Sequence, residues 1–98
     1  MAVNEPGLRA DLDRIRKELD LIDEKLIQLL ARRLDVGLEA AAIKNALHMP
    51  IHDPEREAKA LAQAKKWARD ARLPESEIEE LMRRVISLSR NAQIERGE

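Results

Sequence analysis

The sequence contains no cysteine, no phenylalanine, no tyrosine and only one tryptophan. The absence of cysteine excludes disulfides and thiolate chemistry, and it leaves only histidine and carboxylates as ligands for a zinc ion. Because aromatic residues are nearly absent, the core must consist of Leu, Ile, Val, Met and Ala. The chain also lacks internal repeats, low-complexity tracts and any long linker. The 98 residues are therefore expected to form a single domain, 1–98.

Neither sign of charge dominates, and no long apolar run is present. Charged residues make up 38% of the chain, yet 18 Lys and Arg nearly balance 19 Asp and Glu. This balance argues against a general nucleic-acid or anionic-membrane partner. No apolar run approaches the roughly 20 residues of a membrane span, and the N-terminus has no apolar signal region. A cytoplasmic location, with no nucleic-acid and no membrane partner, is the simplest expectation.

Apolar residues recur with a helical period in three segments. Steps of four and three residues from Leu8 to Leu47 meet an apolar residue at eleven of twelve positions, which we call the first-helix seam. Asp53-Pro54 is a favourable start for a second helix, with Asp as N-cap and Pro in the first turn. Ser76 and Glu79 could form a capping box for a third. No strand pattern is present, so the fold class is all-α, with helices at about 8–47, 54–72 and 76–95.

The first helix is too long for the rest of the chain to cover. About 40 residues span about 60 Å, whereas a compact chain of this length has a radius of gyration near 13 Å. Two later helices of about 20 residues cover only half of the first-helix seam. A second copy is the simplest cover, which predicts an intertwined homodimer of three-helix protomers. The alternative is that the helix breaks near Gly37, but the seam keeps its phase across that glycine.

One position in the first-helix seam is unsuited to a core. Arg33 would be costly to bury without an anion. Lys44, 11 residues later, points in nearly the same direction, about 16 Å along the helix. The small residues Gly37, Ala40 and Ala41 lie between them. A hollow with a cation at each end would suit a small dianion.

Further polar residues are expected near this hollow. Ser89 and Gln93 share the face of the third helix that should be apolar. Arg56 and Glu57 occupy the first turn of the second helix, close to the end of the first. Arg16 lies about 25 Å and about 100° from Arg33, so it could reach the hollow only from the partner of an antiparallel dimer.

Each of these residues also has a plainer explanation. Asp53 is expected to be an N-cap in any case, and Arg56 and Glu57 alone would be a solvated first turn. Lys44 could simply face the C-terminal end of the helix dipole. His48 and His52 are separated by Pro50 and do not share a helix face, so we expect no metal site. Periodicity and charge thus predict a helical dimer with a pocket for a small polyanion, without identifying a reaction.

Four segments together resemble the all-helical class of chorismate mutases. They are "LDRIRKELDLIDEKLIQLLARR", "AIK", "PIHDPERE" and "SRNAQ", and the likeness runs from about Leu12 to Gln93. The resemblance implies an intertwined dimer with two equivalent sites that converts chorismate to prephenate in aromatic amino acid biosynthesis. It assigns substrate contacts to Arg16, Arg33, Lys44, Asp53, Arg56, Glu57, Ser89 and Gln93.

The resemblance also implies a role for each of these side chains. Two arginines of one subunit and one from the other would hold the two carboxylates: Arg33, Arg56 and the partner's Arg16. Lys44 and Gln93 would flank the ether oxygen of the breaking bond. The ring hydroxyl would contact Glu57 and the backbone N–H of Asp53, with Ser89 beside the ring carboxylate. The catalytic set would be Lys44, Gln93, Arg33 and Glu57, and no cofactor and no metal are expected, since the rearrangement is unimolecular.

The sequence alone does not exclude three other functions. A 4-amino-4-deoxychorismate mutase would act on a substrate that differs only at the group Glu57 would touch. Isochorismate-pyruvate lyases share the scaffold, but by the resemblance they lack carboxylates matching Asp53 and Glu57. A non-catalytic helical dimerisation or regulatory module, in complex with another shikimate-pathway enzyme, is the third, although the complete polar set argues against lost activity.

Overall fold

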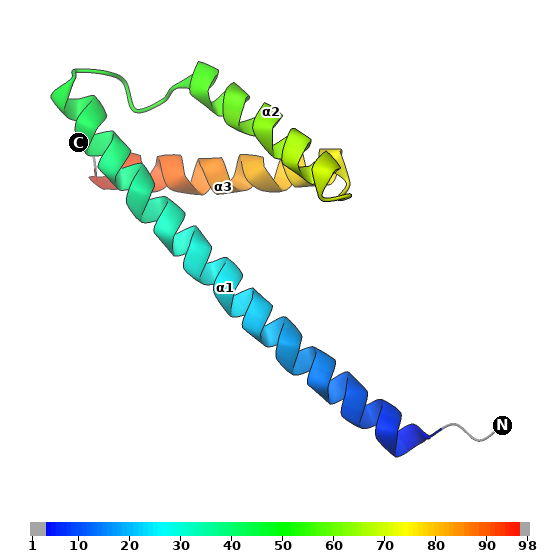
Figure 1. Ribbon diagram of the computed structural model, residues 1–98. Coiled ribbons are helices and arrows are strands. Elements are labelled where there is room, and N and C mark those ends of the chain that lie inside the picture. Colours follow the sequence, from blue (N-terminus) through cyan, green and yellow to red (C-terminus); the bar gives the residue numbers. More distant parts are fainter. Residues whose placement is uncertain (1–3, 97–98) are drawn as a thin grey trace. The chain divides into compact units, whose positions relative to one another are not determined.

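The fold consists of three α-helices joined by two short connections. The computed structural model describes residues 4–96, which form α1 (Glu5–Ala46), α2 (Pro54–Asp70) and α3 (Glu75–Arg96) (Figure 1). The predicted all-α class and the long first helix are thereby confirmed. Among these described residues, no helix is long and apolar enough to cross a membrane.

The first helix begins at Glu5, three residues before the first-helix seam, which is called the α1 seam from here on. The side-chain Oδ1 of Asn4 accepts a hydrogen bond from the backbone N of Gly7 at 3.1 Å. Asn4 therefore caps a first turn in which Pro6 is tolerated, because the N–H that proline lacks would have no partner there. The helix then continues through Gly37 to Ala46. The alternative of a break near that glycine is wrong.

The first two helices end in the same way, on a residue with left-handed backbone geometry. His48 has φ 57° and Arg72 has φ 61°. After α1, the N–H of Met49 donates to the Lys44 carbonyl at 2.8 Å; after α2, the N–H of Leu73 donates to the Ala68 carbonyl at 2.8 Å. These are Schellman motifs in which a side-chain-bearing residue replaces the usual glycine. The second of these motifs ends α2 at Asp70, two residues before the end at 72 that the sequence predicts.

The described residues form two compact units, which divide within α1 between Ala31 and Arg32. In the unit that begins at Arg32, α2 and α3 pack side by side (Figure 1). The buried residues there are small: Ala41, Ala64 and Ala68 are 3% exposed, Ser89 is 4% and Ile86 is 8%. Alanine lets helix backbones approach closely but removes little apolar surface from water. The core of a single chain is correspondingly thin.

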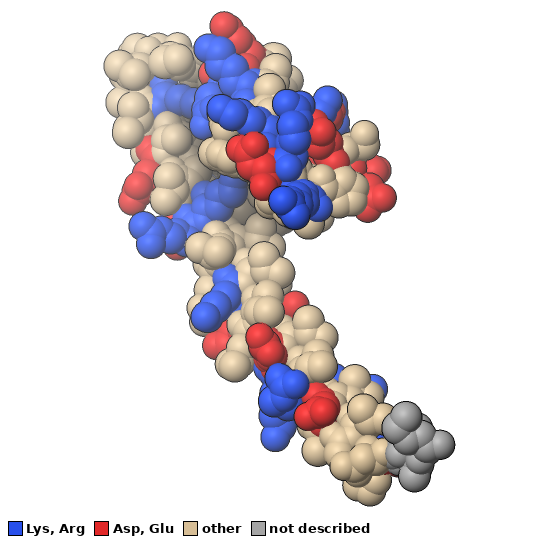
Figure 2. Space-filling model, turned by 45° about the vertical axis from the view of Figure 1, so that its right-hand side comes forward, with Lys and Arg blue, Asp and Glu red and all other residues tan. Residues whose placement is uncertain are grey.

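Ion pairs connect α2 with α3. Arg69 bonds Glu75 at 3.0 Å, and Lys65 lies 3.4 Å from Glu79, which also pairs with Arg83 at 2.6 Å. The hydrogen bond from Arg69 lowers the pKa of Glu75, and the bonds from Arg83 and Lys65 lower the pKa of Glu79. The prediction of a capping box between Ser76 and Glu79 is wrong, because α3 begins before Ser76 and the Glu79 carboxylate pairs with Lys65 and Arg83 instead. Acidic and basic side chains intermingle on the face drawn in Figure 2.

The unit that ends at Ala31 is the first part of α1. Nine of its large apolar residues are 45–65% exposed in the single chain. Seven of them follow the α1 seam: Leu8, Leu12, Ile15, Leu19, Ile22, Leu26 and Leu29. A continuous apolar stripe of this length is unusual on a soluble monomer and is typical of an interaction surface.

Candidate active site

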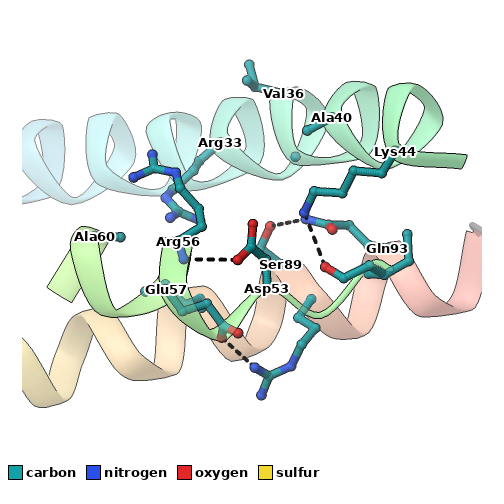
Figure 3. Close-up of a pocket in the computed structure, with 14 residues that line it drawn as sticks. Arg33, Val36, Ala40, Lys44, Asp53, Arg56, Glu57, Ala60, Ser89 and Gln93 are labelled. Atoms are coloured by element: carbon teal, nitrogen blue, oxygen red, sulfur yellow. Dashed lines mark hydrogen bonds and ion pairs between the residues drawn. The ribbon is translucent and has the colours of Figure 1, made fainter. Parts of the chain in front are cut away.

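A pocket of about 470 Å³ lies within the unit that begins at Arg32. Its wall comes from the last turns of α1, from the start of α2 with the loop before it, and from the second half of α3 (Figure 3). The volume lies in the range of sites for small ligands. The lining residues are Arg33, Val36, Gly37, Ala40, Lys44, Ile51, Asp53, Arg56, Glu57, Ala60, Ile86, Ser89, Arg90 and Gln93.

Two arginines line one end of the pocket. In the view of Figure 3, Arg33 extends from α1 and Arg56 from α2 toward the same end. Arg33 is half-buried whereas its neighbour Arg32 is exposed, so Arg33 is the arginine that faces inward. Within residues 4–96, neither the Arg33 nor the Arg56 guanidinium has an ion-pair partner. Two like charges at the same end of a pocket form a natural binding site for an anion.

Lys44 and Gln93 lie toward the other end (Figure 3). The Lys44 ammonium donates one hydrogen bond to the backbone carbonyl of Ile51 at 3.1 Å. This bond ties the last turn of α1 to the loop before α2 and orients the side chain. An ammonium has three N–H donors, so two remain for a ligand.

Ser89 and Gln93 lie one helical turn apart on α3, against Gly37 of α1. The Gln93 amide donates to the Ser89 hydroxyl at 3.2 Å. A Cβ atom added at Gly37 would lie 2.6 Å from the Ser89 oxygen and 3.0 Å from the Gln93 nitrogen. Gly37 is therefore required by close approach, since its backbone does not have positive φ. The absence of its side chain leaves room for these two polar groups.

Two carboxylates line the side of the pocket formed by the start of α2. Asp53 is the N-cap of α2, as expected, and its Oδ1 accepts from the Arg56 backbone N at 3.1 Å. Glu57 forms an ion pair with Arg90 of α3 through Oε1, and its Oε2 lies 3.0 Å from His52 Nε2. Its side chain is only 22% exposed. Both of its oxygens are thus engaged, one by Arg90 and one by His52.

The structure brings seven of the eight predicted site residues to one pocket. Arg16 lies in the other unit and does not line it. The expectation that Ala41 floors the hollow is wrong: Ala41 is buried beside Leu38, Ala42, Asn45 and Arg96 instead, and Val36 lines the pocket with Gly37 and Ala40. In the described part of the chain, no group of three or more His, Cys, Asp or Glu could hold a metal ion.

Sequence reasoning missed Arg90. It follows the predicted Ser89 directly, so it points about 100° away from it on the same helix. A weak signal existed, because an arginine inside "SRNAQ" is flanked by residues of the inward face. Its contact with Glu57 depends on how α2 and α3 pack, and the periodicity of either helix alone does not specify that packing.

Comparison with known proteins finds one matching family and several relatives of this chain. The family model for chorismate mutase type II matches residues 15–94. A T-protein of Enterobacter agglomerans is 36% identical over 88 residues, which cover 90% of this chain and 24% of that protein. A chorismate mutase of Methanocaldococcus jannaschii is 50% identical over 46 residues, 47% of this chain and 46% of the relative. A 4-amino-4-deoxychorismate mutase of Streptomyces venezuelae is 35% identical over 66 residues, 67% of this chain and 64% of the relative. This chain spans from a quarter to less than two thirds of these relatives.

Proposed function

The chain belongs to the chorismate mutase type II family, and we propose that it catalyses the cofactor-free rearrangement of chorismate to prephenate. The observation that carries the proposal is the charge of the pocket. Four cations (Arg33, Lys44, Arg56 and Arg90) and two carboxylates (Asp53 and Glu57) line it, which leaves an excess of two positive charges. That excess matches a dicarboxylate substrate.

Binding has to impose a folded shape on the substrate. In the reactive conformer the enolpyruvyl tail lies over the ring, and this arrangement brings the two carboxylates into a defined relation. The unpaired guanidinium groups of Arg33 and Arg56 are planar forks that bind carboxylates in fixed geometry. Holding the reacting atoms in contact removes much of the entropic part of the barrier.

Lys44 and Gln93 supply the electrostatic part of catalysis. As the C–O bond breaks, negative charge grows on the ether oxygen. The Lys44 ammonium, oriented by Ile51, and the Gln93 amide, held by Ser89, are donors that bind this charge more strongly in the transition state than in the ground state. An acceleration of about 10⁶ requires about 8 kcal/mol, and one such donor typically contributes about 3–4 kcal/mol.

The functional form in this proposal is an intertwined homodimer. The exposed α1 seam of residues 4–31 supports it, because a second copy would remove this stripe from water. Each subunit would then insert Arg16 into the pocket of its partner, where it would be the third arginine for the carboxylates. Light scattering should give twice the mass of one chain, and a monomer at working concentration would contradict this part of the proposal.

A mixing experiment tests the shared site. R16A and R33A homodimers should both be nearly inactive, because every pocket lacks one arginine. After joint unfolding and refolding, half the dimers are mixed, and one of their two pockets has both arginines. Activity should return to about a quarter of wild type. If mixing restores none, Arg16 does not act across the dimer.

The activity itself is tested by giving the purified protein three substrates in parallel. Chorismate, its 4-amino analogue and isochorismate each lose an enol ether absorbance on conversion, and a lyase would also produce fluorescent salicylate. We expect chorismate to be converted and no salicylate to form. R33A should lose at least about tenfold in kcat/KM, the cost of one charge-assisted hydrogen bond, whereas R32A at the exposed neighbouring position should not. Conversion of none of the three would refute the proposal.

A further inference from the structure

We propose that Arg90 is a specificity-determining residue, which makes the Glu57 end of the pocket select a neutral hydroxyl over a cationic amino group. The inference rests on the proposed function and names the substrate class within it. The two substrates at issue differ at one ring position, which carries a hydroxyl in chorismate and an amine in its 4-amino analogue. An aliphatic amine is largely protonated at neutral pH.

The contacts of Glu57 carry the inference. Arg90 Nη1 donates to Glu57 Oε1 across the α2–α3 contact, in the ion pair drawn in Figure 3. His52, in the loop before α2, lies 3.0 Å from the other oxygen. Arg90 and Glu57 both line the main pocket and a second hollow, so this ion pair belongs to the wall that the two hollows share.

In this arrangement Glu57 can still accept a hydrogen bond, but its negative charge is already balanced by the positive charge of Arg90. A carboxylate has about four lone-pair positions, and Arg90 and His52 occupy one on each oxygen. A substrate hydroxyl needs one acceptor and no counter-charge, so it can use a remaining position. An ammonium group needs a net negative partner and would instead face the Arg90 guanidinium at close range.

Partial burial strengthens the electrostatic effect of Arg90 on a neighbouring charge. The Glu57 side chain is 22% exposed and that of Arg90 is 31% exposed. A partly buried pair is screened by solvent and salt much less than a surface pair. A neighbouring ammonium would therefore experience the Arg90 charge more strongly than it would at the protein surface. Repulsion of this kind discriminates against the wrong ligand without requiring any additional attraction to the right one.

The test is the ratio of kcat/KM for chorismate to kcat/KM for the 4-amino analogue. In R90Q this ratio should fall about tenfold, because Glu57 regains an unmatched charge that attracts the ammonium. R90K, which keeps the charge, should retain the wild-type ratio. R84Q is the matched control, since it removes the same charge from an exposed position of the same helix that lines neither of these two hollows. Its ratio should equal that of wild type.

A second variant acts in the opposite direction. E57Q removes the negative charge but keeps Arg90 and an amide oxygen, so the ratio should rise above the wild-type value. If R90Q does not fold, which circular dichroism would show, E57Q tests the proposed role of Arg90 in its place. A ratio unchanged in R90Q while both rates fall together would give Arg90 a merely structural role and overturn the inference, as would a ratio in E57Q that does not rise. If wild type converts neither substrate, the proposed function fails and the inference fails with it.

Discussion

Gly37 offers the sharpest test of how α1 and α3 form the pocket. In a Gly37→Ala variant, the new methyl group would lie 2.6 Å from the Ser89 hydroxyl oxygen and 3.0 Å from the Gln93 amide nitrogen. Both distances are shorter than a van der Waals contact, so these two groups must move. They are the ends of side chains, and each can turn away without moving the backbone.

The effect on stability should be small because two contributions oppose each other. Alanine is better than glycine inside a helix by about 0.5–1 kcal/mol. Crowding a packed site typically costs about 1–3 kcal/mol, and the lower end applies here because flexible groups relieve it. The free energy of unfolding should therefore change by no more than about 1–2 kcal/mol.

The effect on catalysis should be large. Relief of the clash breaks the 3.2 Å hydrogen bond between Gln93 and Ser89 and moves the amide from its position. Loss of an oriented donor costs about 10²–10³ in kcat, so we expect kcat to fall about 100-fold. Initial rates with chorismate and thermal melting followed by circular dichroism measure the two effects separately.

A second α1 variant separates helix stability from pocket geometry. Ala42→Gly alters an exposed position outside the main pocket. It should lose about 1 kcal/mol of stability and keep its kcat. If Gly37→Ala folds and turns over normally, the close approach of Gly37 does not order Gln93, and our account of the ether-oxygen donor is wrong.

Three further predictions concern single side chains. Gln93→Glu should lose activity as pH rises from about 6 to 8, because a carboxyl must be protonated to donate whereas the amide need not be; a pH–rate profile parallel to that of wild type would contradict this. Arg72→Gly should raise the free energy of unfolding by about 0.5–1 kcal/mol, measured by urea titration, since glycine adopts φ 61° without strain. The cations beside Glu79, first Arg83 and then Lys65, lower its pKa in the folded state. Its contribution to stability is therefore complete above pH 4.5, the ordinary pKa, and is lost as pH falls through the folded value. Glu79→Gln should lose less stability than wild type between pH 5 and 3; equal losses in acid unfolding curves would refute the linkage.

The positions of most site residues could be predicted because they depend on helix geometry alone. Arg33 and Lys44 are 11 residues apart, close to three helical turns, so one helix holds them on one face whatever packs against it. Ser89 and Gln93 share a face for the same reason. Asp53 was predictable as an N-cap because its side chain bonds a backbone N–H three residues away.

Other features depended on how helices meet or on backbone geometry. Ala41 and Ala40 are adjacent and equally small, and only the packing against α3 decides that Ala40 faces the pocket while Ala41 is buried elsewhere. The left-handed residues that end α1 and α2 escaped prediction because His48 and Arg72 are not glycine.

The sequence by itself determined the helical class, the length of α1 and the side chains that each helix presents on one face, because these follow from a local period of 3.6 residues and from caps a few residues long. The tertiary structure alone decided that Arg90 reaches Glu57, that Arg33 and Arg56 line the same pocket, and that Gly37 lies against Ser89 and Gln93. Each of these contacts joins residues from different helices, and a contact between helices depends on their packing rather than on the period of either one.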